Sequence, residues 1–228
     1  MLFRVILLSS FLFIISACFF GQTTIGIQDF EAVPATPTMT YTGGTIATGN
    51  GTFPNAPKFV SGSRGNEINN SSTNVTFSTV NASAYSAVYF TCRLASFAGT
   101  SGNGADGADD VIISVSTDGG TTWSQELKVS GNSNAKWSFT SGTGIASTPY
   151  DGNNVTTDFA PGGGGNRTTD GYSTITVTGL PAVANLRVRL EIDNNSGNEY
   201  WVIDDAEILG TSSVPCIAPV SQPTNLVL

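Results

Sequence analysis

Three aspartates stand close together in an acidic, glycine-spaced loop at the start of Gly104–Trp123, which reads GADGADDVIISVSTDGGTTW. Asp106, Asp109 and Asp110 offer carboxylate oxygens, the ligands that a hard cation such as Ca²⁺ prefers. The chain has no histidine, which excludes nucleophilic catalysis by a serine or cysteine paired with histidine, and also the usual catalytic zinc sites. The loop therefore predicts a calcium site, with a solvated acidic turn as the alternative.

Aromatic side chains could supply a platform for a sugar ring. We expect Trp137 and Tyr150 to be the better candidates for glycan binding. Trp123 and Trp201 fit better as anchors of a turn or of the core. For all four residues the alternative is packing, since aromatic side chains bury a large apolar area.

Glycoside hydrolysis is a less favoured hypothesis, because it needs two carboxyl groups roughly 5–10 Å apart in a cleft. Glu126, Glu191 and Glu207 are expected on exposed strand faces, and neither they nor the remaining glutamates, Glu67 and Glu199, stand in an E-x-D-x-x-E type signature. The sequence thus favours a protein without a catalytic site.

A β-hairpin follows the acidic loop. Val111, Ile113 and Val115 alternate with polar residues, and alternation in a strand places them on one face. Asp118-Gly119-Gly120 then predicts a tight turn, because glycine adopts positive φ at no steric cost. The turn resembles the Asp-box pattern S-x-D-x-G-x-T-W of sialidases and other secreted β proteins, where it is a structural turn away from the active site.

The rest of the chain predicts an all-β fold. No segment shows sustained helical periodicity, and alternation predicts about eight to ten strands in a two-sheet antiparallel β-sandwich. The chain between them, 32–58 and 140–171, is expected to be irregular. At Asp204-Asp205 the apolar positions of the last strand change from odd to even residue numbers. This change predicts a β-bulge or, alternatively, a strand buried on both faces. Besides the hairpin, the expected strands are Thr23–Glu31, Asn74–Val80, Ala87–Phe97, Ala135–Phe139, Ser173–Thr178, Asn185–Asp193 and Asn198–Gly210.

The composition indicates an extracellular protein. The 228 residues carry a formal net charge of -8, which argues against nucleic acid as a partner. Residues 1–22 are expected to be a signal peptide, because Arg4 precedes an apolar run too short for a membrane span. Cys18 could instead carry a lipid anchor. Cys92 and Cys216 could form a disulfide, although Cys92 is better placed as a core residue.

The C-terminal end changes character after Gly210. Residues 211–223 are rich in Ser, Thr and Pro and are expected to be an extended linker. Residues 224–228 resemble the opening strand of a fibronectin type III domain. We therefore interpret the chain as the N-terminal part of a longer modular protein, with residues 23–210 as its β-sandwich.

The β-sandwich as a whole resembles the jelly-roll modules of secreted and cell-surface proteins of Bacteroidota. The resemblance is carried by DFE (29–31), residues 104–123, APGGGGNRTTDGYSTITVTGLP (160–181) and YWVIDDAEILG (200–210). These modules are similar to galactose-binding-like and carbohydrate-binding jelly rolls. The resemblance implies a structural calcium ion shared by Glu31 and the Asp204/Asp205 pair, and export by type IX secretion.

The sequence thus predicts a non-catalytic, monomeric, extracellular module, stabilised by calcium and binding a glycan or cell-surface polysaccharide. The alternative is a structural or adhesive spacer domain without a small ligand.

Overall fold

The computed structural model describes residues 21–162 and 170–213. Cys18, Cys216, residues 224–228 and nearly all of the expected signal peptide lie outside the described residues. Among the described residues there are thirteen β-strands and no helix. The strands are β1 (Gln22–Gln28), β2 (Tyr41–Thr42), β3 (Thr45–Thr48), β4 (Arg64–Asn69), β5 (Thr73–Phe77), β6 (Tyr85–Ala98), β7 (Asp110–Ser116), β8 (Ser124–Ser130), β9 (Gly144–Pro149), β10 (Thr157–Phe159), β11 (Tyr172–Leu180), β12 (Arg187–Asp193) and β13 (Glu199–Ser212).

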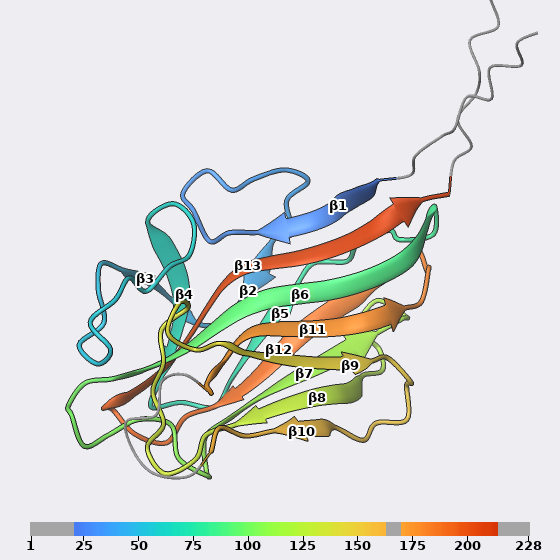
Figure 1. Cartoon of the computed structure of the whole chain (residues 1–228). Helices are drawn as coiled ribbons and strands as arrows, with labels where there is room; N and C mark the ends of the chain where they lie inside the picture. The colour runs from blue at the N-terminus through green and yellow to red at the C-terminus, as the bar shows by residue number, and fades with distance from the viewer. Residues whose placement is uncertain (1–20, 163–169, 214–228) are drawn as a thin grey trace, which may run out of the picture.

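The strands form two sheets packed face to face (Figure 1). The first sheet has the order β3-β4-β13-β6-β11-β9, with β1 also paired to β13, and the second has the order β10-β8-β7-β12-β5-β2. Eight of these strands wind as a jelly roll, with β4-β13-β6-β11 in one sheet and β5-β12-β7-β8 in the other. Successive strands of the eight cross between the sheets, except in the β7–β8 hairpin. The expected two-sheet jelly-roll sandwich is confirmed.

Pairing within those eight strands is antiparallel throughout, but two edge strands differ. β9 pairs in parallel with β11, and β10 pairs in parallel with β8. Both edge strands lie in 140–171, which the sequence predicts to be irregular, and β2 and β3 likewise lie in 32–58. Short edge strands pair through their backbone groups, so hydrophobic alternation does not reveal them.

Several of the expected strand limits are wrong; the strand expected at Asn74–Val80, for example, ends at Phe77. Ala135–Phe139 forms two isolated bridges, Ala105 to Ala135 and Ser96 to Trp137, and not a strand. β1 ends at Gln28, so Glu31 lies in the following loop, and β13 continues to Ser212, two residues into the expected linker.

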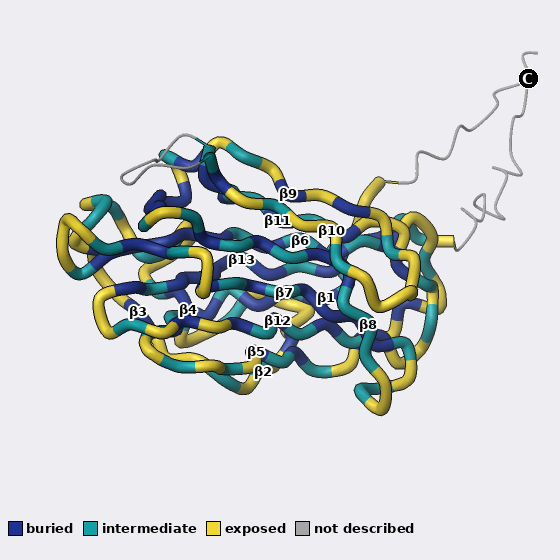
Figure 2. The backbone as a smooth tube through the Cα atoms, turned by 90° about the horizontal axis from the view of Figure 1, so that it is seen from below, coloured by how far each residue is buried: buried dark blue, intermediate teal, exposed yellow. Residues whose placement is uncertain are grey.

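The core lies between the sheets, and buried residues alternate with more exposed ones along many of the strands (Figure 2). Cys92 and Trp201 belong to this core, as expected. The bulge expected at Asp204-Asp205 is confirmed, because the register with β6 shifts between Asp204 and Glu207 and Asp205 has a φ of 44°. The extra residue returns Ala206 and Ile208 to the core face.

The turn between β7 and β8 has the hydrogen bonds that an Asp box requires. The Asp118 carboxylate accepts from the backbone N–H groups of Thr121 and Thr122 and from the hydroxyl groups of Thr122 and Ser116. Trp123 donates its indole N–H to the Gly120 carbonyl at 3.0 Å, which fixes the ring over the turn. The expected structural role of this motif, and of Trp123 as its anchor, agrees with this geometry.

Substituting Asp118 by alanine is expected to lower the midpoint of thermal unfolding, with Thr117→Ala as the control. The hydrogen bonds, above all those from Thr122, lower the pKa of Asp118 to about 2. The Asp118 carboxylate therefore contributes to the stability of the wild type at pH values above the unfolded pKa near 4. This contribution is lost as the pH falls toward 2. Unfolding scans between pH 6 and pH 2 measure it: the two proteins should converge in acid, and a constant difference would contradict this account.

Candidate metal centre

Three carboxylates from two distant parts of the chain converge at one end of the sandwich. Asp106 and Asp109 lie in the loop that crosses from β6 to β7, and Glu199 is the first residue of β13. One oxygen from each residue lies within 4.8 Å of the other two. The predicted acidic loop thus supplies two members, and the third comes from ninety residues further along the chain.

Hydrogen bonds hold the aspartate loop in its shape. Asp109 accepts from the backbone N–H of Asp106 at 2.8 Å and from that of Asn195 at 3.1 Å, so its carboxylate also ties the loop to the β12–β13 connection. Gly131 packs against the loop so closely that a Cβ there would lie 2.3 Å from the Asp106 carbonyl oxygen. A glycine is therefore needed at 131 for the loop to approach β8.

The centre is negatively charged and buried. Asp109 is 0% exposed and Glu199 is 4% exposed. Burial, followed by repulsion from Asp109 and Asp106, raises the pKa of Glu199 to about 7, and burial also raises the pKa of Asp109. Among residues 21–162 and 170–213, no ion pair includes any of the three carboxylates.

One oxygen of the centre lacks an ordinary donor. Glu199 Oε2 is buried and has no N–H or hydroxyl donor in the part of the chain that the structure describes. The side-chain partner of Glu199 is the Asp109 carboxyl, and a hydrogen bond between two carboxyl groups needs a shared proton. A buried carboxylate is costly unless it is protonated, paired or bound to a metal. Three convergent carboxylates suit a hard cation, for which they would provide part of an oxygen shell. The cluster could therefore hold a metal ion.

Asp110, the third residue of the predicted loop site, is not part of this centre. It begins β7 and forms an ion pair with Lys128 at 2.6 Å. Asp109 is buried and Asp110 is partly exposed, as strand alternation requires of neighbours.

The other predicted calcium ligands, Glu31, Asp204 and Asp205, converge on a single turn formed by residues 60–64. Glu31 accepts from the backbone N–H groups of Ser63 and Arg64, both at 2.7 Å. Asp204 accepts from the Val60 N–H at 2.6 Å, and Asp205 accepts from the Ser61 hydroxyl at 2.6 Å. Within the described residues these three acids do not form a group of carboxylates at metal-ligand spacing, as the other cluster does.

The pKa values of Glu31 and Asp204 also shift in opposite directions. Hydrogen bonds led by that from Ser63 lower the pKa of Glu31, whereas burial raises the pKa of Asp204 to about 7. The bulge turns Asp204 into the interior, where it is 0% exposed.

The prediction that Trp137 is a sugar-stacking residue is wrong. Trp137 is 0% exposed, donates its indole N–H to the Leu94 carbonyl and packs edge-to-face on Trp201 at 5.5 Å. Gly142 and Gly171 lie against its ring. The bridge to Ser96 places the Trp137 segment against the first sheet, and its side chain enters the core. Tyr150 is half-buried and packs against the same core, and its contact with a sugar stays a prediction.

Glu126 differs from its expected exposure as well. It is 2% exposed, because a register shift opposite Ile113 and Ser114 makes it the extra residue of a bulge in β8. One of its oxygens accepts from the Asp151 N–H, and the other has no partner among the described residues.

Glu199 was missed because no local pattern marks it. Its position follows from the topology: Glu199 pairs with Ala98 at the end of β6, where the loop that carries Asp106 and Asp109 begins. Only the placement of β13 beside β6 brings the three acids together, and a sequence does not show strand order.

Comparison with known proteins does not assign the chain to a class. No protein-family model matches it, and no curated protein is significantly similar to it. Within the described residues, no helix is long and apolar enough to span a membrane.

Proposed function

We propose that the chain is a non-catalytic extracellular binding module, stabilised by calcium at Asp106, Asp109 and Glu199, whose ligand is a glycan. The observation that carries the calcium part is the buried Glu199 carboxyl, whose Oε2 has no N–H or hydroxyl donor among the described residues and which lies beside two further carboxylates. Calcium suits this set better than zinc, because all three side chains are oxygen donors and calcium accepts about six to eight of them. Water or backbone carbonyls would complete the shell.

The extracellular setting and the glycan ligand are supported by the sequence. The apolar segment in residues 1–22 fits a signal peptide, and the resemblance to secreted jelly-roll modules favours a carbohydrate. The spacer alternative predicts the same fold without any ligand. Hydrolysis is less well supported. Glu126, which was expected on an exposed face, is buried and accepts a hydrogen bond from the Asp151 backbone N–H.

Calcium is expected to raise the free energy of unfolding by about 2–4 kcal/mol once its concentration exceeds the dissociation constant by roughly a hundredfold or more. Thermal or urea unfolding with calcium, and then with excess chelator, measures this difference. Identical unfolding curves in the two conditions would contradict the calcium proposal and leave the spacer interpretation ahead.

Two matched variants locate the ion. Glu199→Gln keeps the shape of the side chain and removes its charge, so it should abolish most of the calcium response. Glu31→Gln removes a charge from the other predicted site and should leave the response intact. The opposite pattern would move the ion to Glu31, Asp204 and Asp205.

A further inference from the structure

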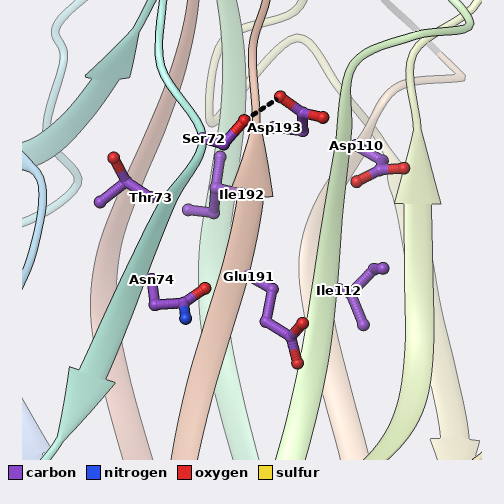
Figure 3. Close-up of a pocket in the computed structure, with 8 residues that line it drawn as sticks. All are labelled: Ser72, Thr73, Asn74, Asp110, Ile112, Glu191, Ile192 and Asp193. Atoms are coloured by element: carbon purple, nitrogen blue, oxygen red, sulfur yellow. Dashed lines mark hydrogen bonds between the residues drawn. The ribbon is translucent and has the colours of Figure 1, made fainter.

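The outer face of the second sheet is hollowed across β5, β12 and β7. The hollow has a volume of about 410 Å³. Figure 3 shows Asn74 on β5, Glu191 and Asp193 on β12, and Asp110 and Ile112 on β7, lying along its sides. The inward-facing neighbours of these residues, such as Leu190 and Val111, belong to the core.

Strand register arranges the face in rows. Asn74 lies opposite Glu191, Glu191 lies opposite Ile112, and Ile112 lies opposite Lys128. In the next row Asp193 lies opposite Asp110. Side chains opposite one another on one face of a sheet are close neighbours, so these rows form a continuous polar surface with Ile112 as an apolar contact in the middle.

Contacts within the face hold its polar groups in place. Glu191 accepts from the Ser114 hydroxyl, from Arg189 at 2.9 Å and from Gln125 at 3.2 Å. Asp110 pairs with Lys128 at 2.6 Å, and Asp193 accepts from the Ser72 hydroxyl at 2.7 Å, the dashed contact of Figure 3. Arg189 is also fixed from its other side, because its guanidinium lies 4.4 Å from the centre of the Trp123 ring.

Four charged side chains of this face are only partly exposed. Lys128, Asp110, Arg189 and Glu191 have side-chain exposures of 29%, 23%, 23% and 24%. Their ion pairs restrict these four side chains before any ligand binds, which reduces the entropy cost of binding.

We infer that this groove binds a neutral, hydroxyl-rich ligand, a stretch of uncharged glycan, through hydroxyl groups that donate to Asp110, Glu191 and Asp193 and a sugar face that rests on Ile112. This inference rests on the proposed function and names its binding face. A carboxylate oxygen has two lone pairs. Glu191 Oε1 is filled by Ser114 and Arg189, whereas Oε2 accepts only from Gln125 and can therefore still accept from a ligand.

The charge of the groove selects the ligand. Its three carboxylates would repel an anionic polymer. At Asp110 and Glu191, a cationic ligand would have to compete with Lys128 and Arg189, which already pair with these two carboxylates. A neutral polyol does not displace these two ion pairs and is not repelled by the carboxylates. For such a ligand the groove provides a few fixed polar groups around an apolar contact, as most small-ligand sites do.

Within the groove, Glu191 is suited to accept hydrogen bonds and not to act as a general acid. A glycosidase needs a carboxylic acid that holds its proton near neutral pH. Hydrogen bonds from Ser114 and Arg189 more than offset the burial of Glu191 and lower its pKa. Glu191 therefore stays ionised and accepts hydrogen bonds.

Binding to a glycan array with neutral and acidic oligosaccharides, followed by titration of the best neutral ligand, tests the inference. We expect binding to neutral members, and a loss of at least tenfold in affinity in Asn74→Ala and in Asp193→Ala. Both residues are exposed, so the variants should fold. Asn55→Ala, at an exposed site beside the first sheet, is the matched control and should bind like the wild type.

The outcomes separate this inference from the proposed function. Glycan binding that survives both groove variants would overturn the groove and keep a glycan-binding module. Absence of binding to any neutral glycan, or binding to acidic glycans alone, would overturn the inference. The calcium response is tested separately, by the unfolding experiment with calcium and chelator. Titration of Glu199→Gln below its unfolding temperature should give wild-type affinity, because Glu199 is outside the groove.

Discussion

Replacing Trp137 by alanine is expected to destabilise the domain by about 3–5 kcal/mol, the cost of removing a large buried aromatic side chain. Trp137 fills the space between Gly142, Gly171 and Trp201, and glycines with closely packed backbones cannot move in to close the cavity. Its indole N–H also satisfies the Leu94 carbonyl, which the truncation would leave without that donor. Urea unfolding followed by circular dichroism measures the difference.

Two further variants keep this prediction testable if Trp137→Ala does not fold. Trp137→Phe retains most of the ring but loses the donor, so it should cost less than the alanine variant. Tyr150→Ala, at the other residue predicted from sequence to contact sugar, removes a half-buried ring and should cost less than Trp137→Ala. If Trp137→Ala unfolds at the same urea concentration as the wild type, Trp137 is not a core residue.

Trp137 also shows where sequence reasoning stops. Alternation within a strand identifies which face is buried, and on that basis the β7–β8 hairpin, β12 and the bulge of β13 could be predicted. Trp137 lies in a segment with two isolated bridges, so alternation gives no information there. Whether an aromatic residue in such a segment enters the core depends on what lies opposite, and Trp201 and the glycines come from other parts of the chain.

The metal centre and the groove have the same dependence on topology. Asp106 and Asp109 could be recognised from their type and spacing, because a glycine-spaced acidic loop is a local pattern. Glu199 could not, because it joins them only through the pairing of β13 with β6. In the groove, the polar residues of β12 and β7 were expected on a solvated face. Their function as one surface follows from the strand order β5-β12-β7.

Without calcium, the free energy of unfolding is expected to fall as the pH rises from 5 to 8. Burial raises the pKa values of Glu199 and Asp204 to about 7, above their unfolded values near 4. A carboxyl group with a raised folded pKa contributes its full stability below the unfolded pKa and loses it as the pH rises through the folded pKa. Each pKa unit is worth about 1.4 kcal/mol, and solvent screening reduces this, so each residue should account for about 1–3 kcal/mol.

The calcium ion proposed above should act in the opposite direction, because it would bind the deprotonated form of the three-carboxylate centre. Protons compete for the same oxygens, so the calcium-dependent gain in stability should be small at pH 5 and largest at pH 8. Urea unfolding at several pH values, with calcium or with chelator, gives both curves. A chelated protein that becomes more stable between pH 5 and pH 8 would contradict the burial of these charges.

Matched variants divide the pH dependence between the two acids. Glu199→Gln should remove its own share of the pH slope together with the calcium response. Asp204→Asn should remove only its share of the slope, because Asp204 lies by the turn at residues 60–64 and not in the cluster with Asp106 and Asp109. Loss of the calcium response in Asp204→Asn alone would place the ion beside Glu31 and the β13 bulge. The buried Glu199 would then avoid its charge by holding a proton.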